Sequence, residues 1–501
     1  MNQLPALAVA VPLLTAAGIS ALNPLLRHRR RLLDATAIVA SAAVTVLLFL
    51  LVADTAHRDV VYWFADFRPS HGVAIGIDFS AGPLNAGLAC LAALLVTAAM
   101  TFSWRYFERV GTYYHALMLT FLAGMAGFCL TGDIFDLFVW FELMGVSAYA
   151  LTAYRPEERG PLQGALNFAI TNSVVAYLSL SGIGLIYART GALNMAQIGS
   201  DISRHRPDGL VVVAFLLIIA GLLIKSAIVP FRFWLADAHA MAPTPVCVLF
   251  SGVMVELGLY GIARVYWSMF GQALGHRSAI TSAFLALGML TAVVGALFCF
   301  RERHLKRLLA FSTISHAGMF LTGIALLTPL GLGDPPGEAP EMARETAEET
   351  RETDEARQRT PLTMIVPAAV LVAAAVGVVF APHLGSAVEA AAVRFQDQPA
   401  YNAAVLSGAQ VAHPAAVFPA EGTGVTVAAV VTGAGSTAGA LVLAFLALYW
   451  RRLPVLRRGF EPGRGLTRPI DRFQSGVVND YVTWVVIGLT CLGGALALAI
   501  R

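Results

Sequence analysis

Charged residues are scarce in this 501-residue chain, since Asp, Glu, Lys and Arg make up only 13% of it. A typical soluble domain contains about 25% charged residues, so the composition excludes a secreted, cytosolic or nucleic-acid-binding globule. Hydrophobic residues account for 57% of the chain, and the mean hydropathy is +0.70. The formal net charge of +3 is small and spread over loops, so no polyanionic partner is indicated. These numbers predict a polytopic membrane protein.

Motifs that hold metals, clusters or nucleotides are also missing. The five cysteines belong to no CxxC or Cys/His ligand pattern, and all of them fall inside apolar runs, where a small core side chain is the simplest interpretation: Cys90, Cys129, Cys247, Cys299 and Cys491. There is no Walker loop, GxGxxG or GxSxG motif in a strand–turn–helix context. We therefore expect no metal, no cofactor and no catalytic redox centre in this chain, so any enzyme class would come from the complex that contains it.

Long apolar runs of the length that crosses a bilayer as a helix recur along the chain. About thirteen spans are predicted, of which ten follow in close succession: 4–24, 32–53, 81–102, 112–131, 134–153, 163–188, 210–231, 244–268, 278–300 and 307–329. Three more are predicted at 361–382, 422–450 and 473–500. The first run lacks a basic region and a cleavage site, so it is predicted to be a span and not a signal peptide.

Four parts follow from this pattern. Residues 1–80 hold the N-terminal spans and a first outer loop, and 81–330 hold the core spans. The segment 331–360 is acidic and polar, which is typical of a solvated, disordered loop. Residues 361–501 carry the C-terminal spans, and the Ala-rich stretch 385–420 between them is structurally ambiguous.

Arginine-rich short loops predict the orientation, because such loops remain in the cytoplasm. The loops after the first, third, fifth and ninth spans carry arginines and share one face, which places the N-terminus outside. With thirteen spans, however, the arginine-rich segment 451–472 also falls outside. An odd number of additional spans between 330 and 361 would return it to the cytoplasmic face.

Lysine is the rarest basic residue, since Lys225 and Lys306 are the only two among 34 Lys and Arg residues. A desolvated lysine can lose its proton, whereas arginine effectively cannot. Lys225 lies deep in an apolar run, where an ionisable group is costly unless it faces a polar cavity or a partner. Pro230 follows and breaks or kinks the helix, and broken helices build mid-membrane ion sites in transporters. Lys225 is therefore predicted to lie on an ion path; the alternative is a lysine that snorkels to the interface.

Two carboxylates lie at similar depth. Glu142 is near the middle of the fifth span, and Lys225 is its obvious partner, since a cation nearby would favour the charged carboxylate. The alternative for this pair is a purely structural contact between two helices. Glu256 lies in the eighth span, where it either relays protons onward from Lys225 or pairs with Arg264 two turns later.

Other polar residues are less specific. His239 is either an ordinary turn residue or part of the path. His316 lies on a Ser/Thr-lined stretch of the tenth span, which is either hydrated or a helix-packing patch. Lys306 begins that span among arginines, where an interfacial anchor is a simpler interpretation than a carrier. Asp133 and Asp136 open the fifth span, and their position at a helix N-terminus explains them.

Four segments of the chain resemble the antiporter-like membrane subunits of respiratory complex I (subunits L, M and N), of Mrp cation/proton antiporters (subunits A and D) and of group-4 hydrogenases. These segments are YYHALMLTFLAGMAG, GDIFDLFVWFELMGVSAYALTAYRPE, LIKSAIVPFRFWLADAHAMAPTPV and RHLKRLLAFSTISHAGM. They follow the family order and cover most of 81–330. The resemblance implies an all-α antiporter-like fold with a broken helix near Pro230, in which Glu142, Lys225 and His239 belong to the input half-channel.

The sequence departs from the family in two ways. Glu256 stands where the family usually has a lysine, which changes the charge of the relay. No lysine follows Lys306 and no second broken helix follows the tenth span, so the second inverted repeat is expected to be incomplete, with about three spans absent after residue 330. Either the gene is internally deleted or the output half-channel comes from another subunit, and we expect that the chain does not complete transport alone.

Three functions remain open. The first is a proton-translocating subunit of a complex I-like NADH-quinone oxidoreductase or hydrogenase assembly. The second is a subunit of the A or D type in an Mrp sodium/proton antiporter. The third is a structural subunit with an incomplete channel. In each case the expected partners are other membrane subunits in a bacterial inner membrane, and the sequence does not distinguish protons from sodium.

Overall fold

The computed structural model describes residues 3–326 with short gaps, together with a few later stretches. The gaps are 26–28, 71, 107–112, 156, 205–207, 275–276 and 303. The later stretches are 366–371, 373–374, 384–408, 481–483, 485–488 and 490. The predicted acidic loop and the span at 422–450 lie outside the described residues, and the spans at 361–382 and 473–500 lie mostly outside them.

Nine of the described helices are long and apolar enough to cross a bilayer. They are α1 (Leu4–Leu22), α2 (Arg30–Thr55), α3 (Pro83–Tyr106), α4 (Tyr113–Leu130), α5 (Ile134–Thr152), α6 (Arg159–Thr190), the continuous helix Thr244–Phe270, α12 (Arg277–Arg301) and α13 (Leu305–Ala325). The remaining predicted span, 210–231, corresponds to a shorter apolar helix, α8 (Gly209–Lys225), which is separated by a break from α9 (Phe233–Met241). These elements match the first ten predicted spans, and the chain is a multi-pass membrane protein; the total of thirteen spans stays a prediction.

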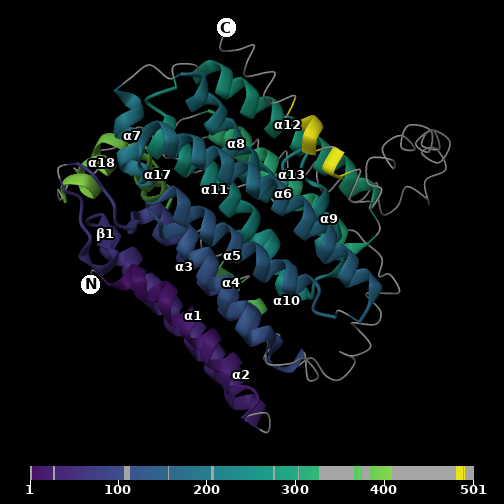
Figure 1. Ribbon diagram of the computed structural model, residues 1–501. Coiled ribbons are helices and arrows are strands. Elements are labelled where there is room, and N and C mark those ends of the chain that lie inside the picture. Colours follow the sequence, from purple (N-terminus) through teal and green to yellow (C-terminus); the bar gives the residue numbers. More distant parts are fainter. Residues whose placement is uncertain are drawn as a thin grey trace, which may run out of the picture.

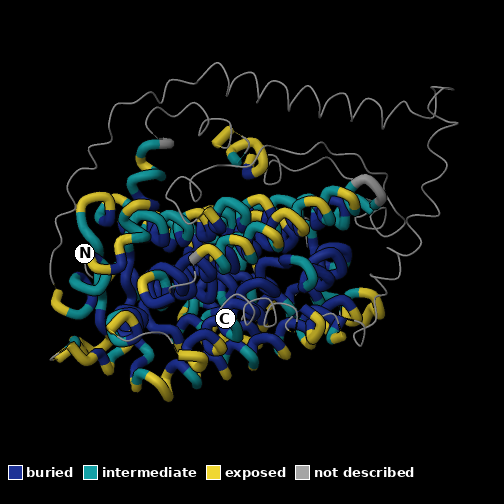
Figure 2. Tube along the Cα trace, turned by 90° about the horizontal axis from the view of Figure 1, so that it is seen from above, coloured by how far each residue is buried: buried dark blue, intermediate teal, exposed yellow. Residues whose placement is uncertain are grey.

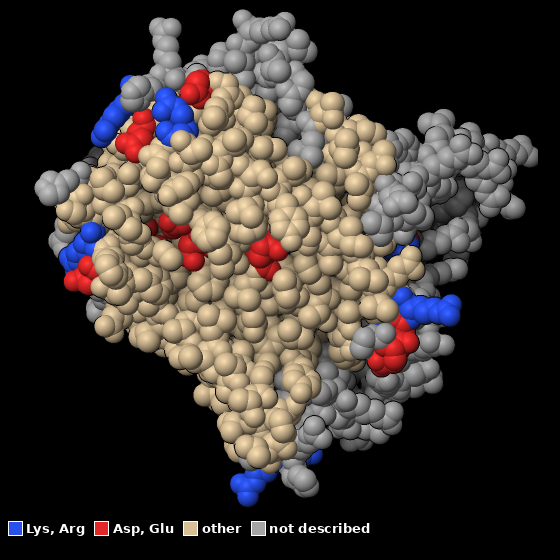
Figure 3. All heavy atoms as spheres, viewed as in Figure 1, with Lys and Arg blue, Asp and Glu red and all other residues tan. Residues whose placement is uncertain are grey.

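The helices pack side by side in a bundle whose interior is apolar (Figures 1 and 2). Small residues allow close approach, as is common between membrane helices. A Cβ atom at Gly295 of α12 would lie only 2.8 Å from the Cα atom of Ser315 on α13. Figure 3 shows a broad uncharged surface with most charged side chains at its margins and small acidic patches within it. This surface is what a lipid-embedded protein requires.

One end of the bundle, here named the outer end, carries the N-terminus and several short elements (Figure 1). The opposite end of the bundle, where α1 ends and α2 begins, is here named the inner end (Figure 1). The short helices at the outer end are α7 (Met195–Ser203), α17 (Leu384–Gln396) and α18 (Gln398–Ser407). Helices α17 and α18 occupy part of the Ala-rich stretch that the sequence left ambiguous.

A two-stranded antiparallel sheet interrupts the otherwise helical fold. Strand β1 (Val60–Trp63) pairs with β2 (Asp78–Ala81), so that Val60 faces Ala81 and Trp63 faces Asp78. A one-turn helix, η2 (Phe64–Asp66), follows β1. The sequence predicted only an outer loop in this region, so the hairpin is an addition to the predicted all-α fold. It brings Asp78 and Ser80 against the outer ends of the membrane helices.

The eighth membrane helix is continuous but not uniform. It consists of α10 (Thr244–Leu249), η3 (Phe250–Met254), α11 (Val255–Val265) and η4 (Tyr266–Phe270), and the two η segments are π-helical. Such π-helical turns are uncommon and frequently mark functional sites. Both Glu256 and Arg264 lie on α11, between the two π-helical segments.

Candidate functional site

The break between α8 and α9 places Lys225 at the centre of the site. Helix α8 ends at Lys225, and residues 226–232 are not α-helical, with Ala227 at φ +51°. Pro230 has no N–H to continue the helix. Other groups hold the break in place, since Trp234 Nε1 donates to the Ile224 carbonyl (2.7 Å). The predicted broken helix near Pro230 is therefore present.

The amine of Lys225 is fully buried and has no hydrogen-bond partner among the described residues. Its Nζ atom lies 4.4 Å from the centroid of the Phe141 ring on α5, a cation–π distance. Glu142, the next residue on α5, interacts with Lys225 electrostatically. In the described part of the chain no ion pair shorter than 4.0 Å joins the two, and Glu142 Oε1 is itself buried without a partner. The site therefore holds two opposite charges near each other that are not locked together.

A glycine on α5 makes room for this arrangement. A Cβ atom at Gly145 would lie 3.4 Å from Lys225 Nζ and 2.9 Å from the hydroxyl oxygen of Tyr149. Glu142 also acts electrostatically on Tyr149, whose buried hydroxyl lacks a hydrogen bond of normal geometry to the described residues. Buried polar groups are normally satisfied by protein or by water. Gly145 thus leaves space beside Lys225 and Tyr149, and neither Gly145 nor Tyr149 was predicted from the sequence.

His239 and Lys306 lie near each other. His239 is buried on α9, and its Nε2 atom lies 3.0 Å from Ser251 Oγ on η3. Lys306 acts electrostatically on His239 and donates to the carbonyl of Ala242 just after α9 (3.2 Å). The structure therefore places His239 in the protein interior and not on a loop surface. The roles of both residues in transport remain predictions.

His316 is half-buried on α13. Of the hydroxyls around it, Ser315 Oγ donates to the Ala292 carbonyl on α12 (3.0 Å) and Thr313 Oγ1 donates within its own helix to Leu309 (3.1 Å). These bonds show that part of the Ser/Thr stretch serves helix packing. Whether His316 also lies on the ion path stays a prediction.

Glu256 does not form the ion pair with Arg264 that the sequence offered as an alternative. Arg264 instead donates to Ser80 Oγ of β2 (2.6 Å). Glu256 is half-buried at the start of α11, and its Oε2 atom has no hydrogen-bond partner among the described residues. The relay role of Glu256 remains a prediction.

Sequence reasoning also missed Arg232, which lies in the break. Its side chain is 3% exposed, and its guanidinium lies 4.1 Å from the centroid of the Phe298 ring on α12 and 5.5 Å from that of Phe311 on α13. Such contacts stabilise a desolvated cation. The sequence signal that could have indicated Arg232 is its position in the motif PFRFW, two residues after Pro230.

The outer end contains a second polar region, built around Asp78 of the hairpin. Asn194, which also caps α7, donates to Asp78 Oδ1 (2.7 Å). Burial raises the pKa of Asp78 to about 7, although the nearby Arg264 guanidinium opposes the rise. Burial likewise raises the pKa of Asp133, the N-cap of α5, to about 6. Asp133 accepts hydrogen bonds from the backbone of Phe135 and Asp136, which confirms that its position at a helix N-terminus explains it.

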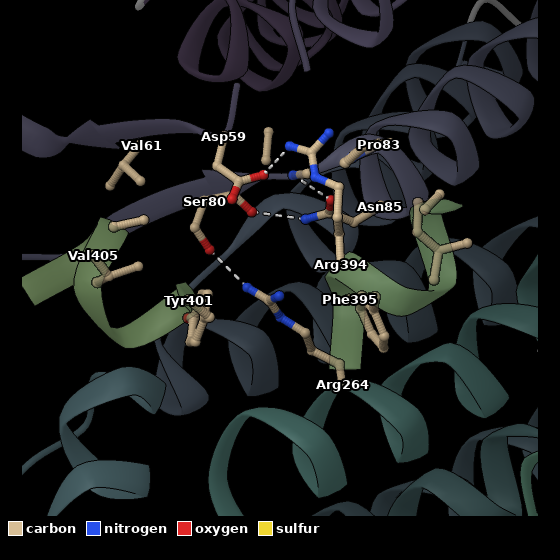
Figure 4. Close-up of a pocket in the computed structure, with 15 residues that line it drawn as sticks. Asp59, Val61, Ser80, Pro83, Asn85, Arg264, Arg394, Phe395, Tyr401 and Val405 are labelled. Atoms are coloured by element: carbon tan, nitrogen blue, oxygen red, sulfur yellow. Dashed lines mark hydrogen bonds and ion pairs between the residues drawn. The ribbon is translucent and has the colours of Figure 1, made fainter. Parts of the chain in front are cut away.

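A pocket lies beside this region, between the hairpin, α3, α11, α17 and α18 (Figure 4). Arg394 of α17 pairs with Asp59 (2.8 Å), and the Arg264 guanidinium lies 4.6 Å from the centroid of the Tyr401 ring on α18. The cavity is about 40 Å³, which is room for about three ordered waters. The pocket is thus polar and large enough to be hydrated.

Comparisons with known proteins agree with this geometry. The family model described as "NADH:quinone oxidoreductase/Mrp antiporter, TM" matches residues 131–332, which include every predicted site residue. Subunit N of the NADH-quinone oxidoreductase of Desulforudis audaxviator is 32% identical over 341 residues, covering 66% of this chain and 65% of that protein. The chain therefore spans slightly less than two thirds of this relative.

Two solved structures are similar as well. A chain of the Mrp complex from Dietzia sp. is 28% identical, with a TM-score of 0.56, covering 66% of this chain and 61% of that one. A chain of an archaeal membrane-bound sulfane sulfur reductase has a TM-score of 0.57 and covers 97% of this chain and 99% of that chain; at 20% identity it supports the fold alone. The family match assigns residues 131–332, which hold the break at Pro230, to the antiporter-like membrane subunits, and the chain as a whole is similar to such subunits.

Proposed function

We propose that this chain is an ion-translocating subunit of a complex I-like NADH-quinone oxidoreductase or group-4 hydrogenase assembly in a bacterial inner membrane. The observation that supports this most strongly is the fully buried, unpartnered amine of Lys225 at a helix break, within electrostatic reach of Glu142. A charge in such a place is expensive unless it serves a function. Its partners would be other membrane subunits, which supply the redox centres.

In this proposal the proton is the transported ion, and core residues 81–330 carry the path. Glu142 and Lys225 form the input, because a charge arriving at or leaving Glu142 changes how readily Lys225 holds its proton. His239, with Lys306 beside it, connects Lys225 towards the inner end, and Glu256 receives the proton further on. His316 lies on the polar side of α13 as a further acceptor. The N-terminal spans and the C-terminal spans support this core.

The main alternative is a subunit of the D or A type in an Mrp sodium/proton antiporter. The 28% identity to a chain of the Dietzia Mrp complex supports it. The same buried lysine and glutamate would serve in either assembly, so the site does not separate the two functions. A third alternative, a structural subunit with an incomplete channel, requires that Lys225 be dispensable.

Purification of the native complex tests the proposal. Copurification with iron–sulfur and dehydrogenase or hydrogenase subunits supports the redox assembly, whereas copurification with small membrane subunits and no redox subunit supports the antiporter. Fluxes of protons and of sodium are then measured in vesicles that contain the complex. Proton flux that Lys225→Ala abolishes is the expected result, and unchanged flux would leave only the structural alternative.

A further inference from the structure

Polar residues recur every four positions along α11, from the middle of the membrane to the outer end. Glu256, Tyr260 and Arg264 follow at this spacing, and Ser268 continues it on η4. Residues four apart lie on one side of a helix. The rest of α11 is apolar, so this side forms a continuous polar line along an otherwise hydrophobic helix.

Hydrogen bonds connect the outer part of this line to the hairpin. Tyr260 donates to the Cys129 carbonyl at the end of α4 (2.7 Å), which also accepts from Asn85 Nδ2 (3.3 Å). Asn85 donates in turn to the Ser80 carbonyl (2.7 Å), and Arg264 donates to the Ser80 hydroxyl. These residues lead directly to the pocket at the outer end, where Arg264, Ser80 and Asn85 form part of the wall (Figure 4).

Several buried polar atoms along this line lack protein partners among the described residues. They are Glu256 Oε2, Arg264 Nε and the Tyr401 hydroxyl. Arg264 is only 6% exposed, so an unsatisfied donor there indicates ordered water. The Asp78 and Asp59 carboxylates act electrostatically on Arg264 and offset part of its charge.

We propose that the Glu256–Tyr260–Arg264 side of α11, together with the pocket at its end, forms an outer half-path through which protons pass between Glu256 and external water. The inference rests on the proposed function of the chain. It differs from the expectation that the second half must come from another subunit, because this half-path lies within the first ten crossings. Tyr260 acts as a positioning residue that holds the waters of this half-path in place. Helices α17 and α18 surround the opening of the half-path to external water.

A pair of tyrosine variants tests whether the polar side of α11 is part of the proton path. Tyr260→Phe in the full chain within its complex removes one hydroxyl from the polar side of α11. Tyr266→Phe removes a buried hydroxyl from a different side of the same helix. We expect Tyr260→Phe to lower proton flux about ten-fold or more, with Tyr266→Phe close to wild type. Equal fluxes in the two variants would overturn the proposal.

A pair of cysteine variants on α18 tests whether the pocket is the exit. Ala404 lines the pocket, whereas Ser407 is exposed on the same helix and does not. Silver ion is a thiol reagent of about the size of the waters that the cavity can hold; added from outside, it should react with Ala404→Cys and inhibit flux relative to the parent chain, and it should react with Ser407→Cys without added inhibition. Absence of reaction at Ala404→Cys, or reaction without inhibition, would contradict an external opening.

Lys225→Ala separates this inference from the proposed function. If Lys225→Ala abolishes flux while Tyr260→Phe and labelled Ala404→Cys do not alter it, the outer half-path is wrong and the proposed function stands. If Lys225→Ala also retains full flux, the proposed function fails, and the half-path fails with it.

Discussion

The mid-membrane site, Lys225 with Glu142, and the outer-end region both contain charged residues, but the contacts of these residues differ between the two places. At the outer end each charge is tied to a fixed partner: Asn194 to Asp78, Arg264 to Ser80 and Arg394 to Asp59. Lys225 and Glu142, in contrast, influence each other electrostatically without a direct hydrogen bond or ion pair. The outer-end charges are therefore held in direct contacts, whereas Lys225 and Glu142 are not. This contrast is what a protein that moves ions requires.

The largest effect is expected from Lys225→Ala. In the proposed function Lys225 accepts and releases the proton, so removal of its buried amine should reduce translocation to background while the complex still assembles. Proton flux in vesicles containing the complex measures this. The comparison is Lys306→Ala, which removes the other lysine of the chain; Lys306 lies beside His239 and donates to the Ala242 carbonyl, so its loss should reduce flux less. Normal flux in Lys225→Ala would show that Lys225 is not needed for translocation, and the mid-membrane site would then have no functional distinction from the outer end.

Glu142→Gln should be next in size. The amide keeps the shape of the side chain but cannot carry the charge that acts on Lys225, so coupled transport should be lost although the subunit assembles. Coupling between electron transfer or antiport and proton flux is the measurement. Full coupling in a normally assembled Glu142→Gln complex would show that the charge of Glu142 is not needed for coupled transport.

A smaller effect is expected from Gly145→Ala. The added methyl group would lie 2.9 Å from the Tyr149 hydroxyl and 3.4 Å from Lys225 Nζ, which shifts the amine. Overpacking of this kind costs about 1–3 kcal/mol of stability, and the displaced amine should lower flux measurably. Gly87→Ala on α3 is the matched control, because nothing lies within 4 Å of the added atom. Equal behaviour of the two alanine variants would show that the space at Gly145 is not used.

The variant Asp78→Asn tests how protonation of Asp78 contributes to the free energy of unfolding. Folding raises the pKa of Asp78 from 3.8 to about 7, chiefly through burial, so the folded state binds the proton more tightly than the unfolded state. The free energy of unfolding should therefore fall as pH rises through this window and level off above about pH 7. The upper limit is about 4 kcal/mol, since each pH unit is worth about 1.4 kcal/mol.

The measurement is thermal unfolding of the purified protein at pH 5 and pH 8. Asp78→Asn should lose part of the difference between the two pH values that wild type shows. Asp66→Asn is the control, because Asp66 lies exposed on the same outer segment. An unchanged pH dependence in Asp78→Asn would mean that the aspartate is charged throughout.

The sequence was sufficient for features that depend on local composition. Apolar run lengths predicted ten crossings, and a proline after a buried lysine predicted the break between α8 and α9. Features that depend on distant contacts were not predictable in the same way. Arg264 and Ser80 are 184 positions apart, and Arg394 and Asp59 are 335 apart, so no spacing rule links them.

Two further differences have local causes that are visible only in three dimensions. The short strands of the hairpin carry no alternation strong enough to stand out beside long apolar spans, so they were treated as a loop. Tyr149 approaches Lys225 because Gly145 has no side chain, and a single glycine in an apolar helix gives no sign of what it accommodates. The sequence therefore located Lys225 and Glu142, whereas Tyr149, Arg232 and the space around them required the structure.

The central claim is that Lys225 works by giving up its proton, and Lys225→Arg tests it most directly. Arginine keeps the charge and much of the length but effectively cannot deprotonate. The measurement is proton flux through the native complex in vesicles, with assembly checked in the same preparation. We predict that Lys225→Arg assembles and is nearly as inactive as Lys225→Ala. Wild-type flux in Lys225→Arg would contradict the claim.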